Sequence, residues 1–344
     1  MYLVKAAFDQ LSTHSNTSYC PISRSAVYRA RWHANPDPWL WFEGVHNGKD
    51  LFARLGRECP DTLLDVSPHT HSRQILEALV DTGFEDECRS DFEIVRDYLA
   101  QHKFEKNTLF VDLGWNGSIQ DAINDILPSD EPIRGYYFGT ISPSRTKHGL
   151  YFQNSSPARR FHRVMQAVSF FEFCFTEPTP RVARIRRERT GDFSFVYTSD
   201  ETDAQIATRR EIEDGALAYL SVMHKLNDAA RFRTKDLVEA MDVIFDRCLR
   251  KPPAAWVEAM DSMTHPGGFG GSATSGMIGD EQGNPLGFLK APWKGGYLVK
   301  HSRSPWHIVM RVLDHPASFT FYSWAKRRVR NWRRMKVGMG KHQF

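Results

Sequence analysis

The sequence predicts an α/β protein with a mostly parallel sheet and a helical extension. In the stretch Thr108–Leu127, TLFVDLGWNGSIQDAINDIL, a short apolar run ends in Asp112 and a glycine-rich turn follows. From Ser118 onward, apolar residues recur at helical spacing, and a second apolar run, Ile133–Thr140, comes next. Strand, turn, helix and strand in this order are typical of a parallel pair with a right-handed crossover. Helical spacing also dominates residues 201–261.

The turn after the first strand is the best candidate for a binding site. In open α/β sheets, Rossmann-like or phosphoribosyltransferase-like, ligands bind outside the carboxyl ends of the strands, where we expect Asp112. The helix that follows offers free backbone N–H groups. The turn is more polar than a helix cap requires, with Asp112, Asn116, Ser118 and Gln120. The alternative is an ordinary turn in which Gly114 and Gly117 permit the backbone geometry and Ser118 caps the helix.

The other elements follow from pattern in chain order. We expect an N-terminal amphipathic helix, a short strand at Tyr19–Ser23 and a helix around Ser25–Trp32. Residues 48–105 have helical character, and the turn Thr190-Gly191-Asp192 predicts a β-hairpin. The expected organisation is an α/β domain over 1–180 with the GWNGS turn, a hairpin over 181–200, a helical extension over 201–261, a Gly-rich loop region over 262–300 and a basic amphipathic tail over 301–344.

Composition is that of a globular protein: 344 residues, of which 41% are hydrophobic and 25% charged. No apolar run approaches the length of a membrane-spanning helix, and the N-terminus lacks the pattern of a signal peptide. The five cysteines are far apart and form no C-x-x-C, which indicates neither a disulfide framework nor a zinc ribbon. We therefore expect a cytoplasmic location.

Several catalytic motifs are missing from the sequence. No two aspartates are separated by a single residue, which excludes D-x-D, and neither H-E-x-x-H nor G-x-S-x-G occurs. The segment Gly44–Lys49 is one residue short of a P-loop, and Gly268–Ala273 matches G-x-G-x-x-A without a preceding strand. The sequence therefore assigns no reaction, no catalytic residue and no dedicated metal site.

Basic charge is concentrated near the C-terminus. The stretch Lys326–Lys336 carries seven basic residues and no acid, and without it the net charge of the chain is −3 instead of +4. Apolar residues recur at helical spacing there: Tyr322, Ala325, Val329 and Trp332. An anionic membrane surface contacted through residues 319–336 is one expectation, and a solvated terminus is the other. Nucleic acid is disfavoured, because the rest of the chain is slightly acidic.

Four segments, in order, resemble a known family. They are Tyr2–Ala26, Phe110–Gln120 (FVDLGWNGSIQ), Gly135–Gly139 (GYYFG) and Phe171–Pro178 (FEFCFTEP). This order resembles the domain that follows the phosphatase-like domain of haloacid-dehalogenase-like proteins from bacterial surface-polysaccharide (O-antigen or capsule) gene clusters. The matching positions are Ser23, Arg24, Asp112, Gly114, Trp115, Gly117, Ser118, Gln120 and Glu172.

The resemblance implies a place in surface-polysaccharide biosynthesis but not the hydrolase activity. In those proteins a strand ending in "SRDG" and the phosphatase-like domain come first, whereas this chain starts at Met1-Tyr2-Leu3. We therefore expect either a stand-alone remnant or a start at an internal methionine. The catalytic aspartates of the family are absent.

These observations together predict a ligand site at the Asp112–Gln120 turn. Arg24 offers a forked donor for phosphate, the helix N-terminus offers N–H groups, and Asp112 is suited to accept sugar hydroxyls or to hold Mg²⁺. The expected ligand is a phosphorylated sugar or a nucleotide-sugar. Two alternatives stay open: Arg24 and Asp112 form a buried structural pair, or the chain is a non-catalytic module that docks on a glycosyltransferase or hydrolase subunit.

Overall fold

A computed structural model describes residues 5, 17–36, 42, 45, 47–55, 57–102, 108–127, 131–154, 158–198, 201–230, 234–266, 274–279 and 282–315. The chain divides into two compact units. Unit 1 holds Met1–Asn154, Phe171–Glu239 and Thr264–Ser275, and unit 2 holds Ser155–Phe170, Ala240–Met263 and Gly276–Phe344. The mixed α/β class predicted from the sequence is confirmed, because helices in unit 1 accompany a parallel sheet.

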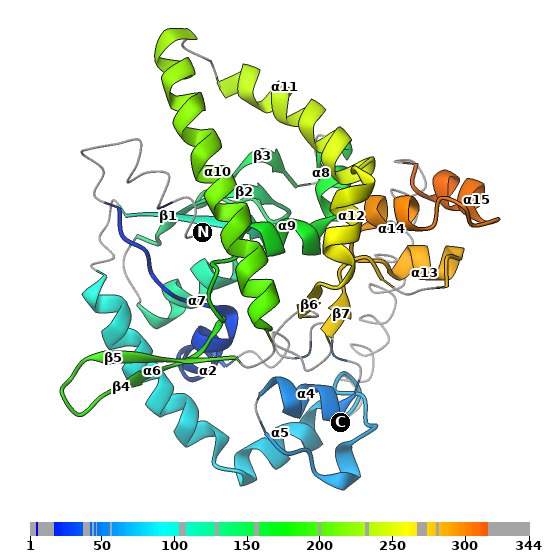
Figure 1. The fold of residues 1–344 in the computed structure, drawn as a ribbon. Coiled ribbons are helices and arrows are strands. Elements are labelled where there is room, and N and C mark those ends of the chain that lie inside the picture. The colour runs from blue at the N-terminus through cyan, green and yellow to red at the C-terminus, as the bar shows by residue number, and fades with distance from the viewer. Residues whose placement is uncertain are drawn as a thin grey trace. The chain divides into compact units, whose positions relative to one another are not determined.

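The sheet of unit 1 contains β1 (Leu109–Trp115), β2 (Arg134–Thr140) and β3 (Lys147–Gln153), in that order (Figure 1). β1 and β2 are parallel, with Asp112 opposite Tyr137, which confirms the predicted strand–turn–helix–strand unit. β3 also pairs parallel to β2, and the sequence did not predict it. Only residues 141–146 connect the two strands, whereas a parallel crossover usually takes a dozen residues or more.

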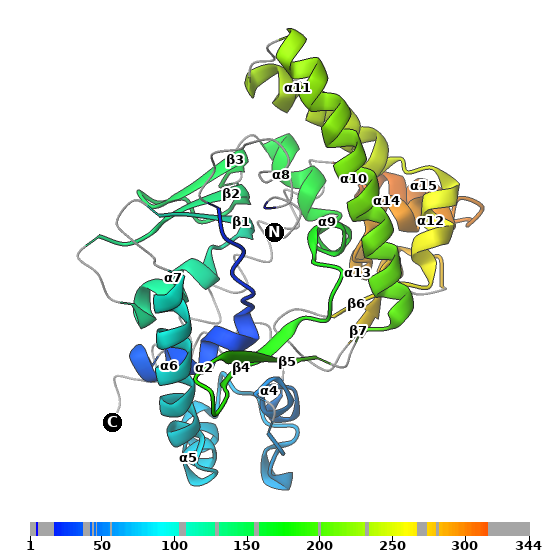
Figure 2. The same cartoon turned by 60° about the vertical axis from the view of Figure 1, so that its left-hand side comes forward.

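Helix α7 (Ser118–Ile126) connects β1 to β2 and packs with α2 (Arg24–Ala34) and α6 (Phe84–Gln101), as both ribbon views show (Figure 2). Its residues Ala122, Ile123 and Ile126 are fully buried. Their spacing places them on one helix face, which explains why this segment folds as a helix against the core. The core of unit 1 continues through α2, α6 and the buried residues of α5 (Ser72–Asp81).

The prediction of a strand at Tyr19–Ser23 is wrong, because this segment has no regular secondary structure. Ser23 instead caps α2, and its hydroxyl accepts a hydrogen bond of 3.2 Å from the N–H of Ala26. The predicted helix after it is confirmed. A serine at a helix start competes with strand formation, because its side chain satisfies a free backbone donor of the first turn.

The predicted hairpin is present as β4 (Val182–Arg187) and β5 (Phe193–Tyr197), an antiparallel pair. Asp91 of α6 fixes its position, because this buried carboxylate pairs with Arg29 of α2 at 2.8 Å and with Arg184 of β4 at 2.7 Å. The two arginines compensate the charge of this carboxylate, which would destabilise the protein if it were buried without a partner. The start of β4 is thereby held beside the start of α2, where the Ser23 hydroxyl donates to the carbonyl of Val182 at 2.5 Å.

The remaining elements of unit 1 are mostly helical. They are α4 (Gly48–Arg54), the 3-10 helix η1 (Asp61–Leu63), the Phe171–Phe175 part of α9 (Val168–Phe175), α10 (Asp203–Ala230) and the short strand β6 (Thr264–Pro266), which pairs with β7 (Thr274–Gly276). α10, α11 (Thr234–Phe245) and α12 (Ala254–Asp261) give residues 201–261 the helical character that the sequence predicts.

Unit 2 packs around Trp293, whose ring is fully buried and stacks on Phe170 at 4.2 Å between centroids. Its helical elements outside α9, α11 and α12 are α8 (Ala158–Met165), the π-helix η2 (Asp246–Arg250), α13 (Pro285–Lys290), α14 (Lys294–Lys300) and α15 (His307–Leu313). Arg163 is buried here between Asp242 and Asp246, at 2.7 Å from each.

The region 262–300, which we expected to be a Gly-rich loop, is not a loop throughout, because it contains the helices α13 and α14. Asn284 accepts a hydrogen bond of 2.9 Å from the N–H of Gly287 and so caps α13, with Pro285 at its first position. These are strong helix-start signals that the neighbouring glycines obscure in the sequence. The domain boundaries expected from the sequence stay a prediction.

Three expectations fall outside the described residues: the N-terminal amphipathic helix apart from Lys5, the Gly268–Ala273 motif, and the C-terminal segment 319–336. Of the P-loop-like segment Gly44–Lys49, residues 44 and 46 also lie outside them. None of the described helices combines the length and apolar character needed to cross a membrane.

Candidate functional site

A pocket of about 310 Å³ in unit 1 opens at the carboxyl end of β1. We call it the β1 pocket. Its walls come from the start of α2, the β1–α7 turn, the end of α9 with the segment leading into β4, the first turns of α10, and Thr264. Its volume lies at the lower end of the range of about 300–1,000 Å³ that is usual for small-molecule sites.

The β1 pocket has walls of mixed charge. Three arginines, four carboxylates and several aromatic rings line it: Arg24, Arg181, Arg209; Asp112, Glu172, Glu177, Glu201; Tyr19, Trp115, Phe173 and Phe175. Of the predicted site residues, it brings together Ser23, Arg24, Asp112, Gly114, Trp115, Asn116, Ser118 and Glu172. Segments that are far apart in sequence therefore converge where the strand–turn–helix pattern predicts a site.

Asp112 is a pocket residue whose protonation is influenced by neighbouring charges. Its Oδ1 accepts a hydrogen bond of 2.7 Å from the N–H of Leu113. The surrounding protein raises the pKa of Asp112 by desolvation, the Leu113 N–H and the charge of Arg24 lower it, and the charge of Glu172 raises it again. The net effect is a raised pKa, so Asp112 holds a proton more readily than a solvated aspartate.

The β1 strand delivers Trp115 to the pocket edge, where Gly114 allows close packing. A Cβ at Gly114 would lie 2.0 Å from the carbonyl oxygen of Gly139 on β2, and its φ is +134°. Trp115 stacks on Phe152 of β3 with 6.0 Å between ring centroids, and its Nε1 donates to Oε1 of Glu172 at 2.8 Å. Glu172 is thereby oriented from α9 toward the end of β1.

The helix at the pocket starts at Ser118, as predicted, but it is not capped by Ser118 as the ordinary-turn alternative requires. Gly117, with φ +69°, is the N-cap of α7, so Ser118 is the first helical residue and does not cap the helix. Asn116 accepts through its side-chain oxygen from Ser142 Oγ at 3.3 Å, and its backbone carbonyl accepts from Lys147 Nζ at 2.9 Å. Lys147 also pairs with Asp121 at 2.6 Å. This buried lysine fixes the turn and was not identified from the sequence, where it is an isolated charge.

Gln120 and Gly117 are not among the described residues that line the β1 pocket, and both have a structural role instead. The side chain of Gln120 is buried; its Nε2 donates to the carbonyls of Ile133 at 2.6 Å and Thr146 at 3.0 Å, and its Oε1 accepts from the hydroxyl of Tyr137. These bonds leave its amide no evident capacity for a ligand. The polarity that suggested a binding residue is used to connect α7 to the sheet.

A further part of the pocket wall was not predicted from the sequence. Tyr19 donates to Oε2 of Glu177 at 2.6 Å, and desolvation together with this bond raises the pKa of Tyr19. Arg209 pairs with Glu201 at 3.0 Å. Tyr19 and Glu177 lie in two of the segments quoted for the family resemblance, whereas Glu201 and Arg209 follow no short motif. Only the fold brings all four to the pocket that Asp112 lines. The sequence offers only one signal for Glu201 and Arg209, namely charged residues at the start of the long helix α10. Such charges are common on solvated helix faces and do not by themselves indicate a site.

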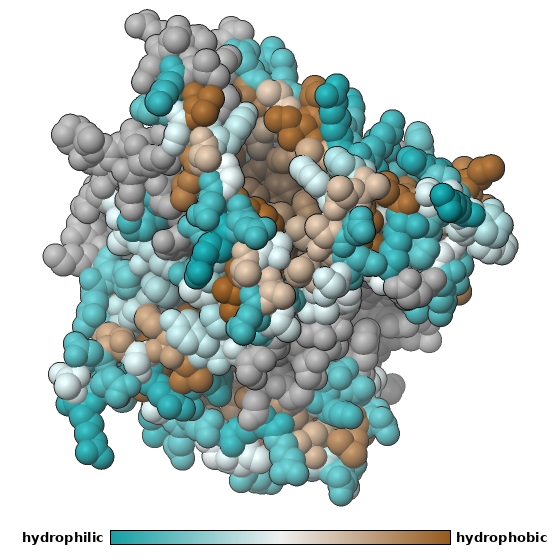
Figure 3. Space-filling model, viewed as in Figure 1, coloured by the Kyte–Doolittle hydropathy of each residue, from teal (hydrophilic) through white to brown (hydrophobic). Residues whose placement is uncertain are grey.

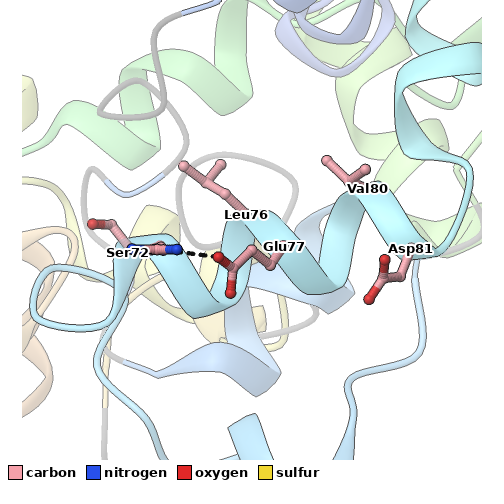
Figure 4. A pocket seen from close by; sticks show the side chains of 6 residues that line it. Ser72, Leu76, Glu77, Val80 and Asp81 are labelled. Carbon is pink, nitrogen blue, oxygen red and sulfur yellow. Dashed lines mark hydrogen bonds and ion pairs between the residues drawn. The ribbon is translucent and has the colours of Figure 1, made fainter.

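A second hollow, of about 400 Å³, is a less suitable site. All six of its lining residues belong to α5, and Figure 4 shows Ser72, Leu76, Glu77, Val80 and Asp81 along this helix. Glu77 pairs with Arg73 at 2.8 Å, as expected of exposed residues four positions apart. A hollow on one helix face has no convergent polar groups, in contrast to the β1 pocket.

The fold and the pocket define an α/β protein with a mixed-charge cavity at the end of a parallel strand. Within the described residues there is no cluster of three or more His, Cys, Asp or Glu side chains placed to hold a metal ion. No family model matches the chain, and no curated protein matches it.

Proposed function

We propose that the β1 pocket binds a phosphorylated sugar or a nucleotide-sugar, and that the protein serves bacterial surface-polysaccharide biosynthesis in the cytoplasm. The single observation that carries the binding proposal is the convergence of arginines and carboxylates on one pocket at the end of β1. A ligand with both phosphate and sugar hydroxyls complements both kinds of side chain. The polysaccharide context rests on the resemblance of the four sequence segments.

The anionic part of the ligand fits the arginines and the start of α7. A guanidinium matches the geometry of phosphate oxygens, and a helix N-terminus adds backbone N–H donors. Arg24 stands at the first position of α2 and Ser118 at the first position of α7, and both line the pocket. The fold is then of a Rossmann-like or phosphoribosyltransferase-like type, in which such groups meet at strand ends.

The carbohydrate part fits the carboxylates and rings. Asp112 and Glu172 face the pocket as acceptors for hydroxyl groups, and Trp115 supplies an aromatic surface beside them. A Mg²⁺ ion is compatible with this set, because magnesium is commonly held by one or two carboxylates together with ligand phosphates. Binding requires no catalysis, and no reaction is assigned to the pocket.

A thermal-shift screen of the full chain with nucleotide-sugars and sugar phosphates tests the proposal. A ligand at about 100 times its Kd raises the free energy of unfolding by about 2.7 kcal/mol. Asp112→Ala and Arg24→Ala should then lose this protection while they keep the stability of the unliganded protein. If the two residues are only a structural pair, each change costs several kcal/mol of stability instead. No stabilisation by any ligand of the panel would contradict the proposal.

A second candidate function is docking on a protein of the same pathway. Tyr219 and Val222 on α10 and Leu237 on α11 are large apolar side chains with exposed surfaces. Tyr219 and Val222 are three positions apart and so share one face of α10, and grouped exposed apolar side chains mark interaction surfaces more often than isolated ones. Co-purification with a glycosyltransferase encoded beside this chain, lost in Tyr219→Ser with Val222→Ser, would favour this role.

The C-terminal end of unit 2 suits an anionic membrane surface. α15 exposes Ile308, Val309 and Val312, and Figure 3 shows apolar side chains at the right-hand edge, where α15 lies. The sequence then continues into the basic stretch 319–336. Apolar and basic side chains together favour binding to anionic lipid. The intact chain should sediment with anionic vesicles at low salt, and this binding should be lost when residues 319–344 are deleted or when the salt concentration is raised. If the intact chain does not bind such vesicles at low salt, the membrane proposal is refuted.

A further inference from the structure

Arg209 of α10 is a buried arginine in the β1 pocket that no sequence motif identifies. Only 2% of its surface is exposed, yet it lines the pocket. Its guanidinium carbon lies 5.8 Å from the ring centroid of Phe173. An arginine buried to this extent needs charged or hydrogen-bonding partners, because its N–H groups have lost water.

The hydrogen bonds of this guanidinium are incomplete. Arg209 Nη2 lies 3.0 Å from Oε2 of Glu201. Nevertheless, neither Nη2 nor Nε of Arg209, nor Oε2 of Glu201, makes an aligned hydrogen bond with any described part of the chain. Glu201 therefore balances the charge of Arg209 but is not aligned with its donors. Within the described residues, Nε of this pocket-lining side chain has no acceptor and Nη2 has only the misaligned contact with Glu201.

The neighbouring residues hold Arg209 in place. Gln205 lies one helical turn earlier, and its Nε2 donates to both the carbonyl and the hydroxyl oxygen of Thr264 at 2.7 Å. Its Oε1 accepts from the N–H of Thr202 at 2.7 Å. The first turns of α10 are thus fixed on both sides. Residues four apart on a helix share a face, so Gln205 and Arg209 lie on the same buried side.

We infer that Arg209 binds the phosphoryl group of the ligand through Nε and Nη2, and that Glu201 balances its charge in the absence of that anion. The inference rests on the proposed function and adds a second guanidinium to Arg24. A phosphoryl group, as a monoester or within a diphosphate, is the chemistry that satisfies a forked pair of donors.

A purely structural Arg–Glu pair makes a different prediction for Glu201→Gln. If the pair is structural, the change leaves a buried charge unbalanced and affects stability alone. If Arg209 binds phosphate, the change removes a competing negative charge and strengthens anion binding. The sign of the effect on affinity therefore separates the two roles.

The test is isothermal titration calorimetry of the full chain with inorganic phosphate, glucose 1-phosphate and UDP-glucose. Arg209→Gln should weaken the tightest of these by about tenfold or more, and Glu201→Gln should tighten it by about threefold. Arg210→Gln is the matched control, because Arg210 is the exposed neighbour of Arg209. The Kd of this variant for the same probe should stay within about twofold of the wild-type value. Circular dichroism reports whether each variant folds.

The outcomes separate this inference from the proposed function. If the wild type binds none of the three probes, both are overturned. If the wild type binds and Arg24→Gln loses binding while Arg209→Gln and Glu201→Gln leave Kd unchanged, only the role of Arg209 is overturned. If Arg209→Gln fails to fold, Arg209→Lys and Glu201→Gln decide, because lysine keeps the charge without the fork and should still weaken binding.

Discussion

The indole Nε1–H of Trp115 donates a 2.8 Å hydrogen bond to Oε1 of Glu172 and so connects the carboxyl end of β1 to α9. The two residues are 57 positions apart in the chain. Because Trp115 ends the edge strand β1 and Glu172 places its carboxylate at the β1 pocket, this contact connects the sheet to the site.

Trp115→Phe should lower the free energy of unfolding by about 1.5–3 kcal/mol, the usual contribution of a hydrogen bond to a charged group. The phenyl ring can still stack on Phe152, so the loss reports mainly the bond to Glu172. Urea denaturation measures it. The control is Trp306→Phe, since Trp306 is exposed and its change should stay within about 0.5 kcal/mol. Equal effects of both changes would contradict this role of Trp115.

Gln120→Ala should cost about 2–4 kcal/mol of stability and leave ligand affinity unchanged, because it strands the buried carbonyl of Ile133 and the hydroxyl of Tyr137. Gln153→Ala is a matched control on the exposed end of β3, where the side chain makes one bond of 3.2 Å to the carbonyl of Gly149. Chemical denaturation and calorimetry are measured on both variants. A loss of affinity at full stability in Gln120→Ala would restore it as a binding residue.

Gly117→Ala should destabilise the protein much more than Gly83→Ala. Both glycines have left-handed backbones, with φ +69° and +72°. A Cβ at Gly117 would lie 2.7 Å from the Tyr137 hydroxyl and 2.9 Å from Cε of Lys147. At Gly83, no atom of the described residues beyond its chain neighbours lies within 4 Å. Gly83→Ala reports the backbone cost of about 1 kcal/mol, and the excess in Gly117→Ala reports crowding. Thermal unfolding compares them, and equal losses would refute the close packing.

Asp112→Asn should change how stability depends on pH. The raised pKa of Asp112 means that the native state holds the proton over a pH range where the unfolded state has released it. Stability contributed by this group is therefore full at pH below the unfolded value of about 3.9 and falls as pH rises through the native pKa. Denaturation midpoints from pH 4 to 8 should decline less in the variant. Parallel curves would show that Asp112 titrates normally.

Local pattern predicted the part of the fold that has short-range signals. The apolar run ending in Asp112 and the helical spacing from Ser118 correctly gave β1, α7 and their parallel partner β2. β3 was missed because six connecting residues are too few for the usual parallel crossover. Tyr19–Ser23 was expected as a strand, but the Ser23 hydroxyl favours the helix start.

The candidate site was predictable only on one side. Asp112, Asn116 and Ser118 share a turn, so their proximity follows from strand geometry. Arg181, Glu201 and Arg209 reach the pocket from segments that are distant in sequence, and no spacing rule relates them to Asp112. Gln120 was predicted as a binding residue because it is polar and close to the turn. Its amide instead donates to the backbone carbonyls of Ile133 and Thr146 and so has a structural role.

Hydrogen–deuterium exchange of the full chain with and without UDP-glucose or glucose 1-phosphate is the decisive test of ligand binding in the β1 pocket, because it locates the bound ligand. We predict slower exchange in the peptides that cover 112–120 and 201–210, with no change in α5, where the other hollow lies. Arg24→Gln should abolish this protection. Protection confined to α5, or exchange that no ligand of the panel alters, would contradict a phosphate and sugar site in the β1 pocket.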